Sequence, residues 1–178
     1  RMRWGLVPNW SKEPRTDASS INARSETMAE KPFFRDSFRN SRCLVPADGW
    51  YEWKTDGKRK TPYFIHLPGE ESFAFAGLWD KWEGTGVDPF ASYAVITKEA
   101  HESVSVIHHR MPVILPERHW GTWLDASARL ETVSSIIEDA LGGFENRTVS
   151  NLVNDVKNEG SELTNPVTRD RQGTLGFP

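Results

Sequence analysis

The sequence predicts an α+β domain built on an antiparallel sheet, and three observations point to that class. Strand-like segments dominate the first two thirds of the 178 residues, helical periodicity appears later, and strands and helices do not alternate regularly. The length fits one domain, since a typical domain has ~100–200 residues.

Six segments are predicted to be strands, because β-favouring or apolar side chains are bounded there by turn residues. They are residues 42–45, 50–54, 62–67, 73–78, 92–97 and 111–115. Asp56-Gly57 is a hairpin signal between the second and third segments. A loop over residues 83–89, with two glycines, links the fourth to the fifth.

Two helices are predicted in the later part of the chain. Residues 117–124 follow a proline and place two tryptophans and a leucine on one face. Residues 131–141 have apolar side chains at helical spacing and end at a Gly-Gly pair that suits a C-cap. Shorter helical turns are expected near residues 25–29 and 99–106.

Composition and charge exclude several classes of protein. There are 22 basic and 25 acidic residues, so the net charge of −3 excludes a globally basic nucleic-acid coat but not a local basic groove. The mean hydropathy is −0.59, yet 8 Trp, 9 Phe and 3 Tyr are far too many aromatic residues for a disordered chain. No apolar stretch approaches the ~20 residues of a membrane span, and one cysteine forms no intrachain disulfide. We therefore expect a soluble cytosolic protein.

Glu52 is the first candidate for acid–base chemistry. It stands in a Trp-Tyr-Glu-Trp segment, and the alternation of a strand puts Trp50 and Glu52 on one face. Indole rings remove water from a neighbouring carboxylate, which favours its protonated form and suits proton transfer. The alternative is an edge-strand Glu paired with a nearby lysine, and the pattern does not separate the two.

His108 and His109 lie between an apolar turn and the predicted strand 111–115, where a loop can deliver side chains into a cleft. Either imidazole suits acid–base work, since the reference pKa of histidine is ~6.5. The alternative is a hydrogen-bonded structural His beside a surface His. The other histidines have no Cys or carboxylate at ligand spacing, so no metal site is predicted.

Three further residues are candidates for binding. Asn22 and Arg24 point the same way if the chain is extended there, and the Arg fork fits a phosphate while Asn both donates and accepts. Spacing alone favours a plainer arrangement, in which Arg24 binds a carboxylate near a helix start. Trp10 stands in a Pro-containing loop where a core role is hard to explain, which makes it a candidate for stacking.

Cys43 lies in an apolar strand and is predicted to be an inert packing residue. A Cys43–His108 thiol hydrolase is a further alternative that rests only on the presence of both residue types. Four cations gather around the hairpin tip, namely Lys54, Lys58, Arg59 and Lys60. They form either a solvated turn or, beside a groove that holds tryptophans, part of a single-strand nucleic-acid site.

Taken in order, these motifs resemble the SOS-response-associated peptidase (SRAP) family of abasic-site processing proteins. The matching stretches are residues 3–8, 21–27, 43–53, 107–112 and 153–163. We therefore predict an SRAP-like domain over residues 1–163, followed by a C-terminal tail over residues 164–178.

The resemblance implies a compact α+β fold with a central antiparallel, barrel-like sheet, flanking helices and a positively charged groove for single-stranded DNA. Family members hold an N-terminal Cys whose amine and thiol capture the aldehyde of an abasic site as a thiazolidine DNA–protein crosslink, without a cofactor. By position, Glu52 and His108 match the catalytic residues and Asn22 matches the Asn that orients the site. The DNA-binding residues that the resemblance implies are Arg24, Arg110 and Trp10.

The family's nucleophilic Cys precedes the motif at residues 3–8, and Cys43 matches an internal strand Cys instead. We expect that the sequence is N-terminally truncated and that the intact protein starts Met-Cys. The alternative is a non-catalytic module that binds single-stranded DNA or a partner protein without crosslinking it. The first interpretation describes a DNA-damage-response enzyme with self-processing peptidase activity. It would be a monomer in the cytoplasm, bound to the nucleoid when on DNA and not to membranes.

Overall fold

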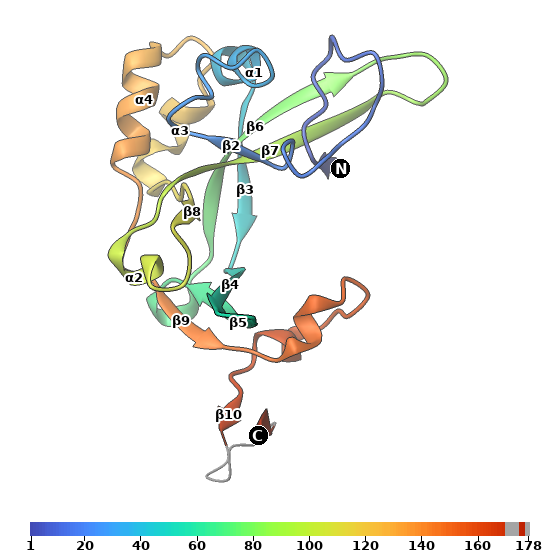
Figure 1. Cartoon of the computed structure of the whole chain (residues 1–178). Coiled ribbons are helices and arrows are strands. Elements are labelled where there is room, and N and C mark those ends of the chain that lie inside the picture. Colours follow the sequence, from blue (N-terminus) through green and yellow to red (C-terminus); the bar gives the residue numbers. More distant parts are fainter. Residues whose placement is uncertain (170–174, 177–178) are drawn as a thin grey trace. The chain divides into compact units, whose positions relative to one another are not determined.

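The computed structural model describes residues 1–169 and 175–176 and divides into two compact units (Figure 1). Unit 1 consists of Arg1–Ala47, Phe73–Glu99 and Met111–Leu141. Unit 2 consists of Asp48–Ser72, Ala100–Arg110 and the described residues from Gly142 onward.

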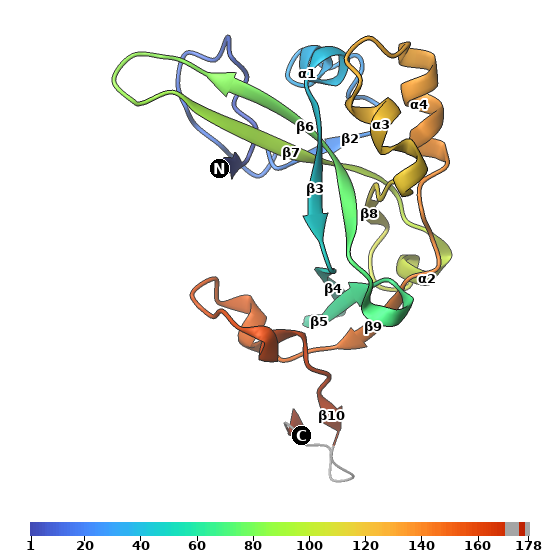
Figure 2. The same cartoon turned by 180° about the vertical axis from the view of Figure 1, so that it is seen from behind.

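Unit 1 is organised around a mixed sheet. Two long antiparallel strands, β6 (Phe73–Trp82) and β7 (Phe90–Glu99), run side by side, and β3 (Arg42–Ala47) pairs antiparallel with β6 (Figures 1 and 2). The short strands β1 (Met2–Trp4) and β2 (Asn22–Arg24) both lie parallel to β7. The sheet also includes β8 (Arg110–Pro112), beside β7.

Three helices pack around one end of β3 and β6 in unit 1 (Figure 2). They are α1 (Arg35–Asn40), α3 (Trp120–Leu124), which follows the 3-10 turn η2 (Glu117–His119), and α4 (Leu130–Glu138). Their apolar faces close the core together with the sheet, because Phe38, Trp123 and Val133 are all buried with the inward side chains of β6 and β7.

Arg42 ties two of these helices to β3. Its buried guanidinium donates to the carbonyls of Phe38 and Arg39 at the end of α1 and to those of Trp123 and Asp125 at the end of α3. Burial lowers the pKa of Arg42 from its usual value, and the neighbouring Asp125 opposes that shift. The side chain therefore joins the carbonyl-rich ends of both helices.

Unit 2 contains a three-stranded antiparallel sheet in the order β4 (Trp50–Asp56), β5 (Arg59–His66) and β9 (Glu145–Thr148). The hairpin between β4 and β5 closes over Gly57-Lys58, and the φ of +57° at Gly57 is one that glycine adopts without strain. This unit also contains one short helix, α2 (Glu102–Ser105), and 3-10 turns at Pro68–Glu70, Asn151–Asn154 and Ser161–Thr164.

The predicted α+β class is confirmed, with differences in detail. The sheet is mixed rather than wholly antiparallel, because β1 and β2 lie parallel to β7. The second predicted helix ends at Glu138, since the N–H of Leu141 donates instead to the carbonyl of Ile114. The expected turn near residues 25–29 is present but forms no helix.

The predicted tail over residues 164–178 lies partly outside the described residues. Within it, β10 (Thr168–Arg169) pairs antiparallel with β11 (Leu175–Gly176). The extent of the domain, residues 1–163, stays a prediction. Across the described part of the chain, no helix has the length and apolar character that crossing a membrane requires.

Candidate active site

Glu52 lies in the middle of β4, an edge strand that pairs with β5. The ladder sets it opposite Tyr63 of β5, which is in turn opposite Thr148 of β9. Its Oε1 accepts a hydrogen bond from the backbone N–H of Trp53 at 3.0 Å, and 23% of its side chain is exposed. As the sequence predicts, Trp50 shares its face by strand alternation, and that indole packs edge-on against Phe144 at 5.1 Å.

His108 is presented by the turn that follows α2. The turn is anchored by buried Val104 and Ile107, and the backbone N–H of His108 donates to the carbonyl of Val104 at 3.1 Å. The ring Nδ1 lies 3.1 Å from the carbonyl oxygen and 3.2 Å from the backbone nitrogen of Arg110, so either tautomer finds a partner. The backbone of the loop therefore fixes the ring, while 35% of the side chain stays exposed.

The structure brings Glu52 and His108 together. The Oε2 of Glu52 lies 3.7 Å from the Nδ1 of His108, a distance of ion pairing rather than of a direct hydrogen bond. Both side chains are only partly buried, so a reacting group can approach either of them. A carboxylate and an imidazole at this separation can divide the roles of proton donor and acceptor.

The opposite face of β4 is fixed by other contacts. The indole N–H of Trp53 donates to Asn154 at 2.8 Å, and the Tyr51 ring packs against Phe64 at 5.4 Å. Burial raises the pKa of Tyr51, the negative charge of Asp48 adds to the rise, and Arg147 opposes it. Together with the Trp50–Phe144 contact on the other face, these contacts hold both faces of the strand that carries Glu52.

Asn22 and Arg24 lie on β2 of unit 1, exposed on either side of the buried Ala23. They therefore point the same way, as predicted for an extended segment. Trp10 is 56% exposed in its loop, where it packs edge-on against Phe33 at 6.3 Å. Since these residues belong to unit 1, their role beside the Glu52–His108 pair stays a prediction.

Two further predicted residues occupy strands. Arg110 begins β8 with a half-buried side chain, directly after the two histidines. Cys43 lies on β3 opposite Gly77, whose missing side chain makes room for it, since a Cβ there would lie 2.8 Å from the Sγ. Burial raises the pKa of Cys43 to about 11, so its thiol is protonated at neutral pH, which agrees with packing and argues against a thiol hydrolase.

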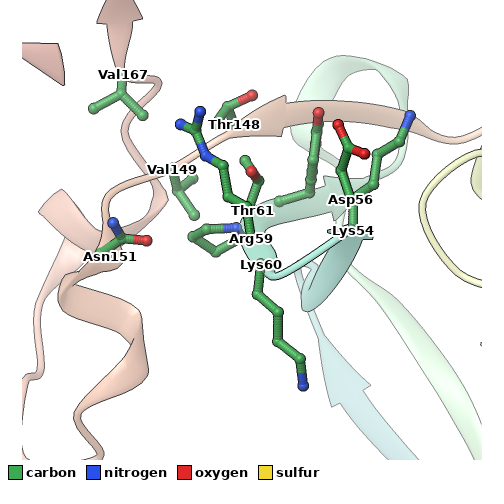
Figure 3. Close-up of a pocket in the computed structure, with 11 residues that line it drawn as sticks. Lys54, Asp56, Arg59, Lys60, Thr61, Thr148, Val149, Asn151 and Val167 are labelled. Atoms are coloured by element: carbon green, nitrogen blue, oxygen red, sulfur yellow. The ribbon is translucent and has the colours of Figure 1, made fainter. Parts of the chain in front are cut away.

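A cavity of 540 Å³ lies at the β4–β5 hairpin and β9, all within unit 2 (Figure 3). The sequence indicated its cations but not the cavity, because Glu145–Thr148 is too polar to be recognised as a strand. The only available signal was the pair of apolar residues, Phe144 and Val149, that flank the polar run. Across residues 1–169 and 175–176, no group of three or more His, Cys, Asp or Glu side chains is placed to hold a metal ion.

The geometry thus defines a class of site, a carboxylate of an antiparallel hairpin beside an imidazole of the turn that follows α2, in an α+β protein. The chain belongs to the SOS response associated peptidase (SRAP) family, whose model matches residues 1–156. The resemblance in the sequence motifs is thereby confirmed.

Several known proteins are similar along most of the chain. The abasic site processing protein YoqW of Bacillus subtilis is 41% identical over 167 residues, covering 92% of this chain and 74% of that protein. The abasic site processing protein HMCES of Gallus gallus is 37% identical over 191 residues, covering 93% of this chain and 56% of that protein. A crystal structure of a protein from Bacteroides thetaiotaomicron superposes with a TM-score of 0.81 at 28% identity, covering 94% of this chain and 76% of that one.

Proposed function

We propose that this protein processes abasic sites in single-stranded DNA by forming a covalent DNA–protein crosslink in the DNA-damage response. The observation that carries the proposal is the Glu52–His108 pair, which offers two partly exposed groups for proton transfer 3.7 Å apart. Membership in a family whose curated relatives are named abasic site processing proteins supports the substrate. We take residues 1–163 as the domain that does this work.

The crosslink would form in two steps that balance without an oxidant or a cofactor. The amine of an N-terminal Cys in the intact protein attacks the aldehyde carbon of the ring-opened sugar, and the carbinolamine loses water to give an imine. The thiol sulfur then adds to the imine carbon while the nitrogen takes up a proton, which closes the thiazolidine. The net change is one new ring and one released water.

Glu52 and His108 would move the protons of these steps. Glu52 gives a proton to the departing hydroxyl of the carbinolamine, since expulsion of hydroxide without a proton donor is slow. His108 either stabilises the hydroxyl of the opened sugar or takes up a proton. A Met-Cys start would require removal of the initiator Met, which is the self-processing that we propose for the peptidase activity.

The remaining predicted residues would hold the DNA. Arg24 and Arg110 would contact phosphates, Asn22 would orient the abasic sugar, and Trp10 would stack on a displaced base. Splayed bases are needed for stacking, so single-stranded DNA should bind better than duplex. We propose that the protein acts as a monomer in the cytoplasm, at the nucleoid when it is bound to DNA.

The test is a crosslinking experiment with the intact protein. An oligonucleotide with one abasic site is incubated with the protein, and the product is separated under denaturing conditions and weighed by mass spectrometry. We expect a species whose mass equals protein plus DNA minus one water, and none with a tetrahydrofuran analogue that lacks the aldehyde. Tight binding without any covalent product would favour the non-catalytic DNA-binding module instead.

A further inference from the structure

Most of the strand residues that line the cavity of unit 2 lie on the same face of the sheet as Glu52. Directly opposite residues of an antiparallel ladder share a face, and the ladder sets Glu52 opposite Tyr63 and Lys54 opposite Thr61. Tyr63 and Thr61 both line the cavity, and so does Thr148, which lies opposite Tyr63 on β9. Lys54 is two residues beyond Glu52, which is about 7 Å along a strand. A ligand in the cavity is therefore a neighbour of any group that reacts at Glu52.

The lining of the cavity is rich in cations. Lys54, Arg59 and Lys60 line it, against one carboxylate, Asp56. Figure 3 shows the guanidinium of Arg59 extending toward Thr148, whereas Lys60 points away from the other labelled side chains. Lys54 and Arg59 are thus the cations best placed to meet a ligand on the Glu52 face.

None of the polar side chains of this lining is engaged within the protein. In the part of the chain that the structure describes, no ion pair or side-chain hydrogen bond is made by Lys54, Asp56, Arg59, Lys60, Thr61, Tyr63, Thr148 or Asn151. Two cations, three hydroxyls and an amide around one cavity match a ligand with several acceptor oxygens and negative charge.

We propose that this cavity binds a phosphate group through Lys54 and Arg59. During the reaction it would hold a backbone phosphate of the strand whose abasic residue reaches Glu52, and this second part rests on the proposed function. A phosphate fits because it is anionic and accepts several hydrogen bonds at once. The proposal extends the DNA-binding surface to a region where the family resemblance placed no site residue.

The carboxylate of Asp56 should affect phosphate binding in the opposite sense to the cations. It lines the same cavity and lies opposite Arg59 on the hairpin, so it repels a bound phosphate. Removing that charge with Asp56→Asn should strengthen phosphate binding, whereas removing a cation should weaken it. A hairpin with a purely structural role would not give effects of opposite sign at the two positions.

The experiment measures binding of an undamaged single-stranded oligonucleotide by fluorescence anisotropy over a range of salt concentrations, with the intact protein. We expect Lys54→Met and Arg59→Met each to lower affinity about fivefold at low salt and to flatten the logarithmic salt slope by about 0.7, the value for one phosphate on a single strand. Asp56→Asn should raise affinity about twofold. Lys58→Met is the matched control, because Lys58 is exposed on the same hairpin but does not line the cavity.

A second arm separates strand phosphate from free phosphate. Thermal unfolding is followed with and without inorganic phosphate, using sodium chloride of equal ionic strength as the reference. Stabilisation that is lost in both Met variants, with unchanged DNA affinity, would overturn the strand assignment and leave a free-anion site. No change in either arm, or equal losses in Lys58→Met, would overturn the proposal altogether. If the variants behave as expected but the parent protein never crosslinks abasic DNA, the proposed function fails and the phosphate site stands.

Discussion

Replacing Glu52 by Gln and His108 by Ala, singly and together, separates a catalytic pair from a structural one. At 3.7 Å, a protonated His108 and an ionised Glu52 attract by about 4 kcal/mol at an effective dielectric constant near 20. Because 23% and 35% of the two side chains are exposed, solvent screening reduces their contribution to the free energy of unfolding to about 1 kcal/mol or less. Glu52→Gln should therefore change stability very little.

The crosslinking rate should respond far more strongly. Loss of a general acid or base slows a reaction by about two decades or more, which corresponds to about 2.7 kcal/mol in the activation free energy. The double variant should lose less than the product of the two single losses, because groups that act as one unit are not additive. DNA affinity should stay nearly constant, since an anionic carboxylate would not bind a phosphate.

Two measurements on each variant make the comparison. Urea unfolding gives the free energy of unfolding, and single-turnover crosslinking to an abasic oligonucleotide gives the rate from about pH 5 to about pH 9, across the titration range of histidine. Glu145→Gln is the control, since it removes an exposed carboxylate from β9 of the same sheet. If Glu52→Gln reacts at the parental rate at every pH, Glu52 is not the acid and the reasoning from its geometry is refuted.

Three other predictions use different properties of the chain. Arg24→Ala and Arg110→Ala should each weaken binding of single-stranded DNA and flatten its salt slope by about 0.7, and unchanged slopes would remove both residues from the interface. Cys43 should react slowly with a thiol reagent at neutral pH and faster as the pH rises toward its pKa of about 11. After denaturation it should react at once, and fast labelling of the native protein would reopen the thiol-hydrolase alternative. Arg42→Met should destabilise the fold by about 3 kcal/mol, because it removes charged donors from carbonyls at two helix ends, and should lower Tm by about 6–12 °C. The control Arg39→Ala changes an exposed side chain and should shift Tm by no more than about 2 °C.

Local pattern was enough to predict the hairpin of unit 2 but not its full length. The signal at Asp56-Gly57 located the turn, yet the closing residues are Gly57-Lys58, so the strands continue to Asp56 and restart at Arg59. The strand propensity of Lys and Asp is low, and the ends of the strands exist because each residue finds a partner across the ladder. Pairing of this kind depends on the partner strand, so it cannot be predicted from the residues of one segment alone.

The same reason explains the strands that were missed or shortened. The side chains Glu145–Thr148 have no apolar alternation of their own, but β5 offers them a free edge to pair with. The strand predicted over residues 111–115 is shorter in the ladder, because β8 ends at Pro112, which has no N–H to donate, and an isolated Phe75–Ile114 bridge follows it.

The candidate site was predictable only in part. Strand alternation placed Glu52 on the face of Trp50, and the loop junction singled out His108, but nothing in their spacing shows that they meet. Their approach to 3.7 Å depends on a turn anchored by Val104 and Ile107, and the sequence linked them through family resemblance alone. The phosphate cavity could not be foreseen, because one of its walls is the unrecognised strand β9.

The bonds of Arg42 have a consequence for how unit 1 opens. The guanidinium of this one residue donates to carbonyls that both helices leave free, so a single side chain caps the ends of α1 and α3. The last turn of either helix therefore cannot fray without withdrawing donors from the other. In amide hydrogen exchange, the protection of these two helix ends should be lost in a single opening event, so that segments some eighty residues apart in sequence behave as one cooperative element.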